Sequence, residues 1–85
     1  MKWKEITQYH PNRLVLVEAL QASSKNRVRT IEEMAVIQEY EDPKEAWEGY
    51  KLFHKKDPQR ELYIFHTSRE NVEVIEEFFS AVRQH

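Results

Sequence analysis

The residue types that could carry out catalysis are grouped in one stretch, RELYIFHTS at 60–68. His66 could act as a general base, and the hydroxyls of Thr67 and Ser68 are nucleophiles that a base activates when the two groups are within hydrogen-bond reach. The stretch alternates as a β-strand does, however, and successive strand side chains point to opposite faces. No Gly-x-Ser-x-Gly elbow surrounds the hydroxyls. We therefore predict no catalytic residue and no enzyme, and keep a small hydrolase using His66 with Ser68 as the least favoured hypothesis.

The two hydroxyls also have a structural explanation. Thr67 followed three residues later by Glu70 has the spacing of a capping box, and Ser68 is an equally suitable N-cap. Apolar residues then recur every three to four positions, so the pattern predicts a helix over residues 69–83. The alternative is a fourth strand through NVEVIEEF, where Val72 and Val74 alternate with Glu73.

Metal binding would depend on histidines, because the chain contains four of them and no cysteine. No two histidines are spaced i, i+4, so ligands would have to converge from separate elements, such as His54 and His66 with Glu18. A histidine at the margin of a helix or sheet is more often a hydrogen-bonded structural residue, and we predict no metal and no cofactor. Glu18 interrupts an apolar strand, and we expect it to pair with a base such as Arg29 or Arg60 rather than to face the sheet margin, since a buried carboxylate needs a partner.

Basic residues near the expected hairpin turn are the main feature that suggests phosphate binding. The segment SSKNRVR contains Lys25, Arg27 and Arg29, but the whole chain has a net charge of −2. No RNP-like, KH or helix-turn-helix pattern accompanies these residues, and a single glycine rules out a glycine-rich phosphate loop. A nucleic-acid-contacting accessory protein is therefore the alternative function, and we do not expect nucleic acid as the main partner.

The first half of the chain predicts a helix followed by a hairpin. The sequence KWKEITQY predicts a short helix that ends before Pro11, because the residue before a proline avoids helical angles. Four consecutive apolar residues at 14–17 indicate a central strand covered on both faces. The polar segment QASSKNR predicts a turn in which Asn26 takes a left-handed conformation. VRTIEEMAVIQEY returns as a second strand, with a β-bulge because Glu32 and Glu33 disturb its alternation.

The second half predicts a helix, a third strand and a last element. Asp42 is a suitable N-cap, Pro43 fits the first helical position, and Glu45 lies three residues after the cap, which is the clearest helix start in the chain. Trp47 and Tyr50 belong to an apolar stripe at helical spacing, which we expect to lie on the sheet. The sequence ELYIFHT predicts the third strand.

These elements predict a single α+β domain over residues 1–85, in the order α-β-β-α-β-α. A right-handed crossover would place the third strand beside the first and parallel to the second, so the small three-stranded sheet has the order 2-1-3. One helix cannot cover both faces of a sheet. The lead-in helix, the C-terminal helix or a second subunit must cover the other face.

The composition and the exposed sheet edges indicate how the domain meets other molecules. A chain of 85 residues has a small core, and the third strand has neither proline nor lysine to discourage edge pairing. Charge also alternates in blocks, basic over 1–30 and acidic over 31–50. We therefore predict a homodimer at micromolar concentration, with a monomer covered by its C-terminal helix as the alternative. No apolar run approaches the length of a membrane span, so we expect a cytoplasmic protein without membrane contact.

The leading hypothesis is a non-enzymatic protein-interaction module that self-associates, with a further protein partner of unknown identity. Aromatic side chains are enriched in such interfaces. The candidate binding residues are Trp3, Trp47, Tyr50 and His66, with Phe78 or Phe79 as further aromatic candidates and Lys25, Arg27 and Arg29 for the alternative function.

The early Trp3, the segment RLVLVEAL and the segment DPKEAWEGYKLFHKKDPQRELYIFHTS together resemble a family of small uncharacterised bacterial proteins. Members of that family look alike in a VEA segment followed by RELY(V/I)(F/Y)HTS. The resemblance covers most of the chain and implies a bacterial, soluble, single-domain protein. No function is known for that family, so the resemblance implies no site residue.

Overall fold

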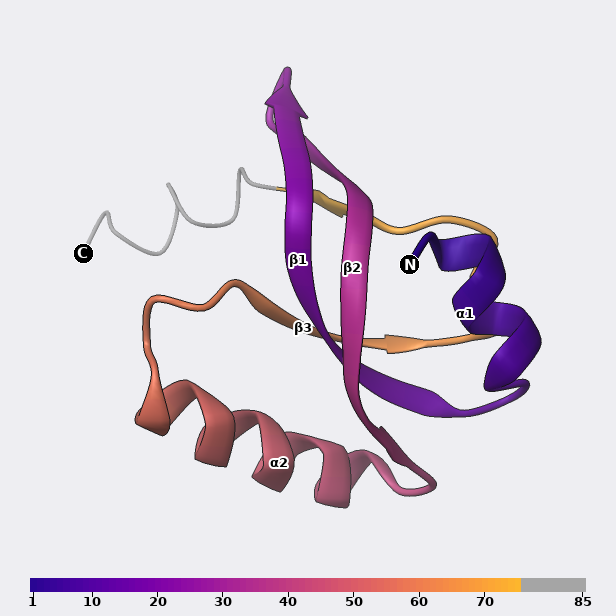
Figure 1. Cartoon of the computed structure of the whole chain (residues 1–85), viewed down its shortest axis with the longest axis vertical. Coiled ribbons are helices and arrows are strands. Elements are labelled where there is room, and N and C mark those ends of the chain that lie inside the picture. Colours follow the sequence, from indigo (N-terminus) through magenta and orange to yellow (C-terminus); the bar gives the residue numbers. More distant parts are fainter. Residues whose placement is uncertain (76–85) are drawn as a thin grey trace.

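A long hairpin of two strands forms the frame of the fold (Figure 1). In the computed structural model, which describes residues 1–75, this hairpin is joined by two helices and two shorter strands. The elements are α1 (Trp3–Tyr9), β1 (Leu14–Lys25), β2 (Val28–Tyr40), α2 (Pro43–Lys56), β3 (Leu62–His66) and β4 (Glu73–Ile75). Within these residues the strands form one antiparallel sheet in the order β3-β1-β2-β4. The predicted order 2-1-3 is confirmed, and β4 extends the sheet beyond β2.

The hairpin turn depends on two residues with a left-handed backbone. Asn26 has φ 53° and Arg27 has φ 65°, and they connect the paired residues Lys25 and Val28. Positive φ at both central residues is the property of a type I′ turn, whose twist matches that of the flanking strands. The expected left-handed conformation of Asn26 is confirmed, whereas Arg27 occupies the position that usually carries glycine.

The bulge expected in the second strand is confirmed at Glu32. The consecutive β1 residues Gln21 and Ala22 pair with the residues on either side of Glu32, which therefore has no cross-strand partner. The extra residue changes the phase of β2 and brings Ile31 onto the same face as Met34, three positions further along. Both side chains are buried in one core cluster.

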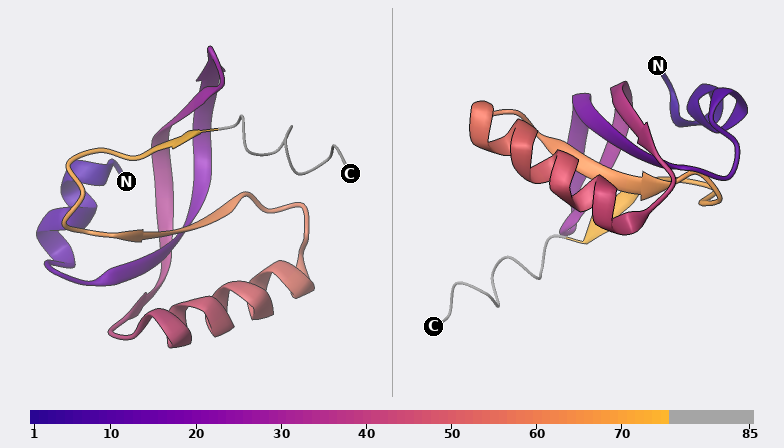
Figure 2. Two further views of the ribbon diagram at one scale, coloured as in Figure 1. Left: turned by 180° about the vertical axis from the view of Figure 1, so that it is seen from behind. Right: turned by 90° about the horizontal axis from the view of Figure 1, so that it is seen from below.

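The two helices cover opposite faces of the sheet (Figure 2). The core cluster on the α1 side consists of Trp3, Ile6, Val15, Val17, Ile31, Met34, Phe65 and Val72. Leu16 is fully buried and points to the other face, because side chains alternate along β1. There α2 packs on β1 and β3 and contributes the fully buried Ala46. Among residues 1–75 the lead-in helix is the covering observed. Residues 76–83 of the expected C-terminal helix lie outside the described part of the chain, and a covering second subunit stays a prediction.

The helix α2 begins at the residues that the sequence predicts. Asp42 is its N-cap, and Asp42 Oδ1 accepts a hydrogen bond from the Lys44 N–H at 3.0 Å. Pro43 occupies the first helical position, where its missing N–H costs no intrahelical bond. Because residues three to four apart share one face of a helix, the position of this start determines which residues of α2, such as Ala46, face the sheet.

The helix predicted over residues 69–83 is wrong for the described part of that range. Residues 69–72 form a loop that buries Val72 in the core, and β4 follows it and pairs with the start of β2. At the end of β2 nearest the hairpin turn, backbone N–H and C=O groups on the outer edge need hydrogen-bond partners. Pairing with β4 supplies these hydrogen bonds, which a helix in the same place would not. The alternative fourth strand is therefore observed, while residues 76–83 lie outside the described part of the chain.

The predicted capping role of Thr67 is also wrong. Thr67 Oγ1 donates a hydrogen bond to the carbonyl of His10 at 2.7 Å and accepts one from the N–H of Arg13 at 2.9 Å. The residue is 6% exposed. Its two hydrogen bonds connect the end of β3 to the loop between α1 and β1. Ser68 contacts the His66 ring instead of capping a helix.

Candidate functional site

A groove of about 500 Å³ runs along β3. Its lining includes Trp47, Tyr50 and His54 from α2, Leu62 and Ile64 from β3, and Val74 from β4. We call this feature the β3 groove. Because most of these side chains are apolar, the groove is suited to an apolar or aromatic surface rather than to a small ion.

A stack of three rings forms the α2 wall of the β3 groove. The ring centroids of Trp47 and Tyr50 are 5.2 Å apart and the planes differ by 8°, while Tyr50 and His54 are 5.6 Å apart with a difference of 6°. Spacings of three and four residues place the rings on one side of the helix. Trp47 is 52% exposed, and the Lys51 ammonium lies 5.8 Å from its ring centroid. The stack is therefore an aromatic surface that is open to contact at Trp47.

The edge of β3 presents unpaired backbone groups to the β3 groove. The amide of Ala19 donates to the carbonyl of Glu61 at 2.9 Å, which fixes the phase of the ladder with β1. In an antiparallel pair the bonded residues alternate, so the odd-numbered residues of β3 bond to β1. The N–H and C=O groups of Leu62 and Ile64 therefore point away from β1. No other strand among residues 1–75 pairs with this edge.

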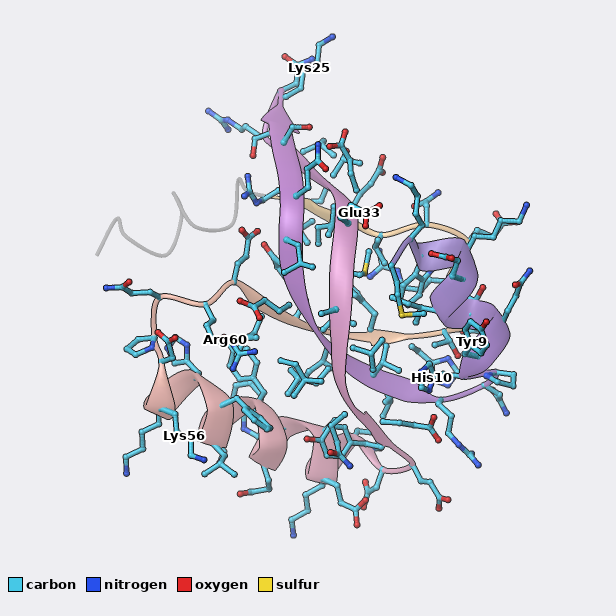
Figure 3. The ribbon with its side chains drawn as sticks, in the orientation of Figure 1. Tyr9, His10, Lys25, Glu33, Lys56 and Arg60 are labelled. Carbon is cyan, nitrogen blue, oxygen red and sulfur yellow. The ribbon has the colours of Figure 1, made fainter. Side chains whose placement is uncertain are left out.

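Two ion pairs close one end of the β3 groove. Arg60 Nη2 lies 2.8 Å from Glu18 Oε1, which confirms the predicted pairing of Glu18, and Arg60 lies between α2 and the sheet (Figure 3). Arg29 binds Glu61 with two nitrogens, one of them 2.8 Å from Oε1, and Glu61 Oε2 accepts the Tyr63 hydroxyl at 2.6 Å. These cations and carboxylates neutralise one another. The polar end of the groove thus has no strong preference for either sign of charge.

The same network changes the acidity of its members. The hydrogen bonds from Arg29 hold the pKa of Glu61 below the ordinary value of 4.5, and the Tyr63 hydroxyl acts in the same direction. Burial and the neighbouring Glu61 carboxylate raise the pKa of Tyr63 to about 12. Glu61 is therefore ionised and Tyr63 is neutral and donating at neutral pH.

The three basic residues predicted for phosphate contact do not form one patch. Arg29 turns toward Glu61 and Ser24, so its charge is already engaged. Lys25 and Arg27 remain exposed at the hairpin tip, which extends away from the body of the domain (Figure 3). For the alternative function of contacting nucleic acid, only Lys25 and Arg27 of the three predicted residues have exposed charges.

The stretch that first suggested catalysis forms a local turn. His66 Nδ1 accepts the backbone N–H of Ser68 at 3.1 Å and lies 2.8 Å from Ser68 Oγ. In residues 1–75 no carboxylate holds the other ring nitrogen, and His66 does not line the β3 groove. Thr67 is engaged by backbone groups. The pair of His66 and Ser68 is close enough for proton transfer, but nothing described completes a triad around it.

The residues weighed as zinc ligands are not brought together. His54 stacks on Tyr50, and Glu18 is paired with Arg60. No group of three or more histidine and acidic side chains among the described residues is placed to hold a metal ion.

Trp3 is in the core, and its predicted role as a binding residue stays a prediction. It is 7% exposed, its indole N–H donates to the carbonyl of Arg69 at 2.8 Å, and its ring meets Phe65 edge to face. The spacing of apolar residues does not distinguish Trp3 from Trp47, so the sequence predicts a binding role for both. Phe78 and Phe79 lie outside the described residues.

Sequence reasoning missed part of the β3 groove. His54 could have been included, because it lies seven residues after Trp47 on the same helical face. Ile64 and Val74 could not, because β3 and β4 are at opposite ends of the strand order and line the same groove only in the folded sheet.

Comparisons with known proteins give no guide to this site. No protein-family model, no curated protein and no solved structure matches the chain. In the part of the chain that the structure describes, neither helix combines the length and apolarity needed to cross a lipid bilayer. The geometry of the β3 groove is therefore the main indication of function, and the family resemblance stays a prediction.

Proposed function

We propose that this domain is a non-enzymatic protein-interaction module that binds an extended segment of its partner along the β3 groove. The observation that carries the proposal is the coincidence of an exposed aromatic wall with an edge of β3 to which no strand among residues 1–75 pairs. A strand added to β3 would hydrogen-bond to Leu62 and Ile64, as peptides do in β-augmentation. Its side chains on the α2 side would then lie against the Trp47 stack.

The β3 edge lacks the features that normally prevent strand addition. Natural edge strands are protected by proline, by central lysine, by bulges or by a covering element. The sequence LYIFH of β3 has no proline or lysine, and its register with β1 contains no bulge. An edge of this kind is a hazard unless a partner uses it, which supports a binding role.

The peptide specificity follows from the chemistry of the groove. Hydrogen bonds to the main chain of β3 supply affinity without sequence preference, whereas alternate side chains meet the aromatic wall. We therefore expect segments with aliphatic or aromatic residues at every second position. The neutralised ion pairs at one end should make net charge of the segment a minor factor.

The test is selection from a displayed library of random peptides on the immobilised full chain. Selected peptides should show apolar residues in alternation and should bind Ile64→Val, which keeps both the N–H and an apolar side chain, about as well as the wild type. Ile64→Pro should lose binding, because it removes an N–H that points into the groove while leaving the bonds to β1 in place. Selected peptides that bind Ile64→Pro as tightly as the wild type would contradict the proposal.

A further inference from the structure

The edge of β3 is complementary to itself. Its outward-facing residues are Leu62, Ile64 and His66, which are evenly spaced about Ile64. In an antiparallel pair, residues that both face outward exchange two hydrogen bonds. A twofold axis through Ile64 would therefore match every outward-facing position of one β3 with an outward-facing position of a second β3.

The side chains agree with this register. Ile64 would lie opposite Ile64 of the second copy, and Leu62 opposite His66. Between them Tyr63 would lie opposite Phe65, an aromatic cross-strand pair in the closer, non-hydrogen-bonded position. Each position is thus matched without a bulge or an inserted residue.

The flanking charges also permit the register. Arg60 and Glu61, which precede β3, would lie opposite Ser68 and Thr67 of the second copy. Like charges that lie directly opposite each other destabilise a strand pair, and this register has none. A slip by two residues would place Arg60 opposite His66 and Leu62 opposite Ile64. It would also bring the two Tyr63 side chains opposite each other.

We infer that the partner of the β3 groove is a second copy of this chain, joined β3 to β3 about a twofold axis at Ile64. This inference rests on the proposed function and names its partner. The pairing extends each sheet into the other and brings Ile64 of each copy beside the Trp47 stack of its mate. The 52% exposed Trp47 then gains an apolar neighbour that the single chain lacks.

Cysteine cross-linking tests the axis directly, because the chain has no cysteine of its own. In Ile64→Cys the two cysteines face each other at a Cα separation of roughly 5.5 Å, within the range of a disulfide. Mild oxidation should convert this variant to a covalent dimer. His66→Cys is the matched control, because its two cysteines lie on opposite sides of the axis and should cross-link several-fold less.

A mixture of variants tests the register. Leu62→Cys and His66→Cys should each give little covalent dimer after oxidation, whereas an equimolar mixture should give a mixed covalent dimer. Equal cross-linking of Ile64→Cys and His66→Cys, or no mixed dimer, would overturn the proposed axis. Circular dichroism of each variant verifies that it is folded.

Sedimentation equilibrium of the wild type at several concentrations measures the association itself. The mass should approach twice 10.3 kDa at micromolar concentration and should return to 10.3 kDa in Ile64→Pro. A wild-type mass of 10.3 kDa throughout would overturn the dimer. Selected peptides that still bind such a monomer would leave the proposed function standing, so the two failures are distinguishable.

Discussion

The two helices each carry one tryptophan, and the two tryptophans have different surroundings. Trp3 of α1 is 7% exposed and hydrogen-bonded to the loop after β3, whereas Trp47 of α2 is 52% exposed and belongs to an open stack of rings. The α1 face of the sheet is closed by its own chain, and the α2 face is left with an apolar wall. We conclude that aromatic residues on the first face hold the fold and that those on the second are available for binding.

The largest expected difference is between alanine substitutions of the two tryptophans. Trp3→Ala should lower the free energy of unfolding by about 3–5 kcal/mol, because it leaves a cavity in the core. Trp47→Ala should change it by less than about 1 kcal/mol and should weaken binding of the selected peptides. Urea unfolding measures the first effect and peptide titration the second. Equal losses of stability would show that Trp47 is also a core residue.

The next largest effect is the loss of stability expected when the hydroxyl of Thr67 is removed. Thr67→Val keeps the shape of the side chain but leaves the His10 carbonyl and the Arg13 amide without the hydroxyl, which should cost about 1–3 kcal/mol. Ser68→Ala is the control on the exposed side of the turn and should change stability by less than about 0.5 kcal/mol. The same unfolding measurements apply. A larger loss for Ser68→Ala would reverse the roles assigned to the two hydroxyls.

A smaller effect should appear in the pH dependence of stability, through Glu61 at the end of the β3 groove. Its pKa is lowered in the folded chain, first by the hydrogen bonds from Arg29, so the ionised form favours folding. This stabilisation is complete above the ordinary glutamate pKa of 4.5 and is lost as the pH falls through the lowered folded value. Glu61→Gln should therefore lose less stability than the wild type between neutral and acidic pH. Parallel urea curves at each pH decide this.

The smallest change in stability is expected at the hairpin tip, which packs against neither α1 nor α2 (Figure 1). Arg27 has φ 65°, a conformation that glycine adopts without the steric cost, so Arg27→Gly should stabilise the domain by about 0.5–1 kcal/mol. Peptide binding at the β3 groove should be unchanged. A change in that binding would mean that the tip contributes to the site.

Local patterns were sufficient for much of the fold. Four apolar residues in a row identified β1 as the central strand, and Asp42 with Pro43 identified the start of α2. The charge of Glu18 within that strand correctly implied a basic partner, which is Arg60. In each case the deciding neighbours are either close in sequence or required by burial.

Long-range contacts account for the errors. The capping interpretation of Thr67 failed because its partners, His10 and Arg13, are far away in the sequence and nothing near Thr67 indicates them. The helix predicted over 69–83 failed in its first part because β2 offered an edge for pairing. Likewise, spacing alone could not show that Trp3 is enclosed and Trp47 is open.

The β3 groove forms only when β3 has paired with β1. β1 and β2 are joined by a two-residue turn, so their pairing closes a short loop, whereas β3 reaches β1 only after the whole of β2 and α2. Closing the longer loop costs more chain entropy, and non-local pairing is the slower step of folding. An unfolded or half-folded chain therefore has no β3 groove. A partner that binds the groove selects completely folded molecules, and by mass action it raises their share of the population.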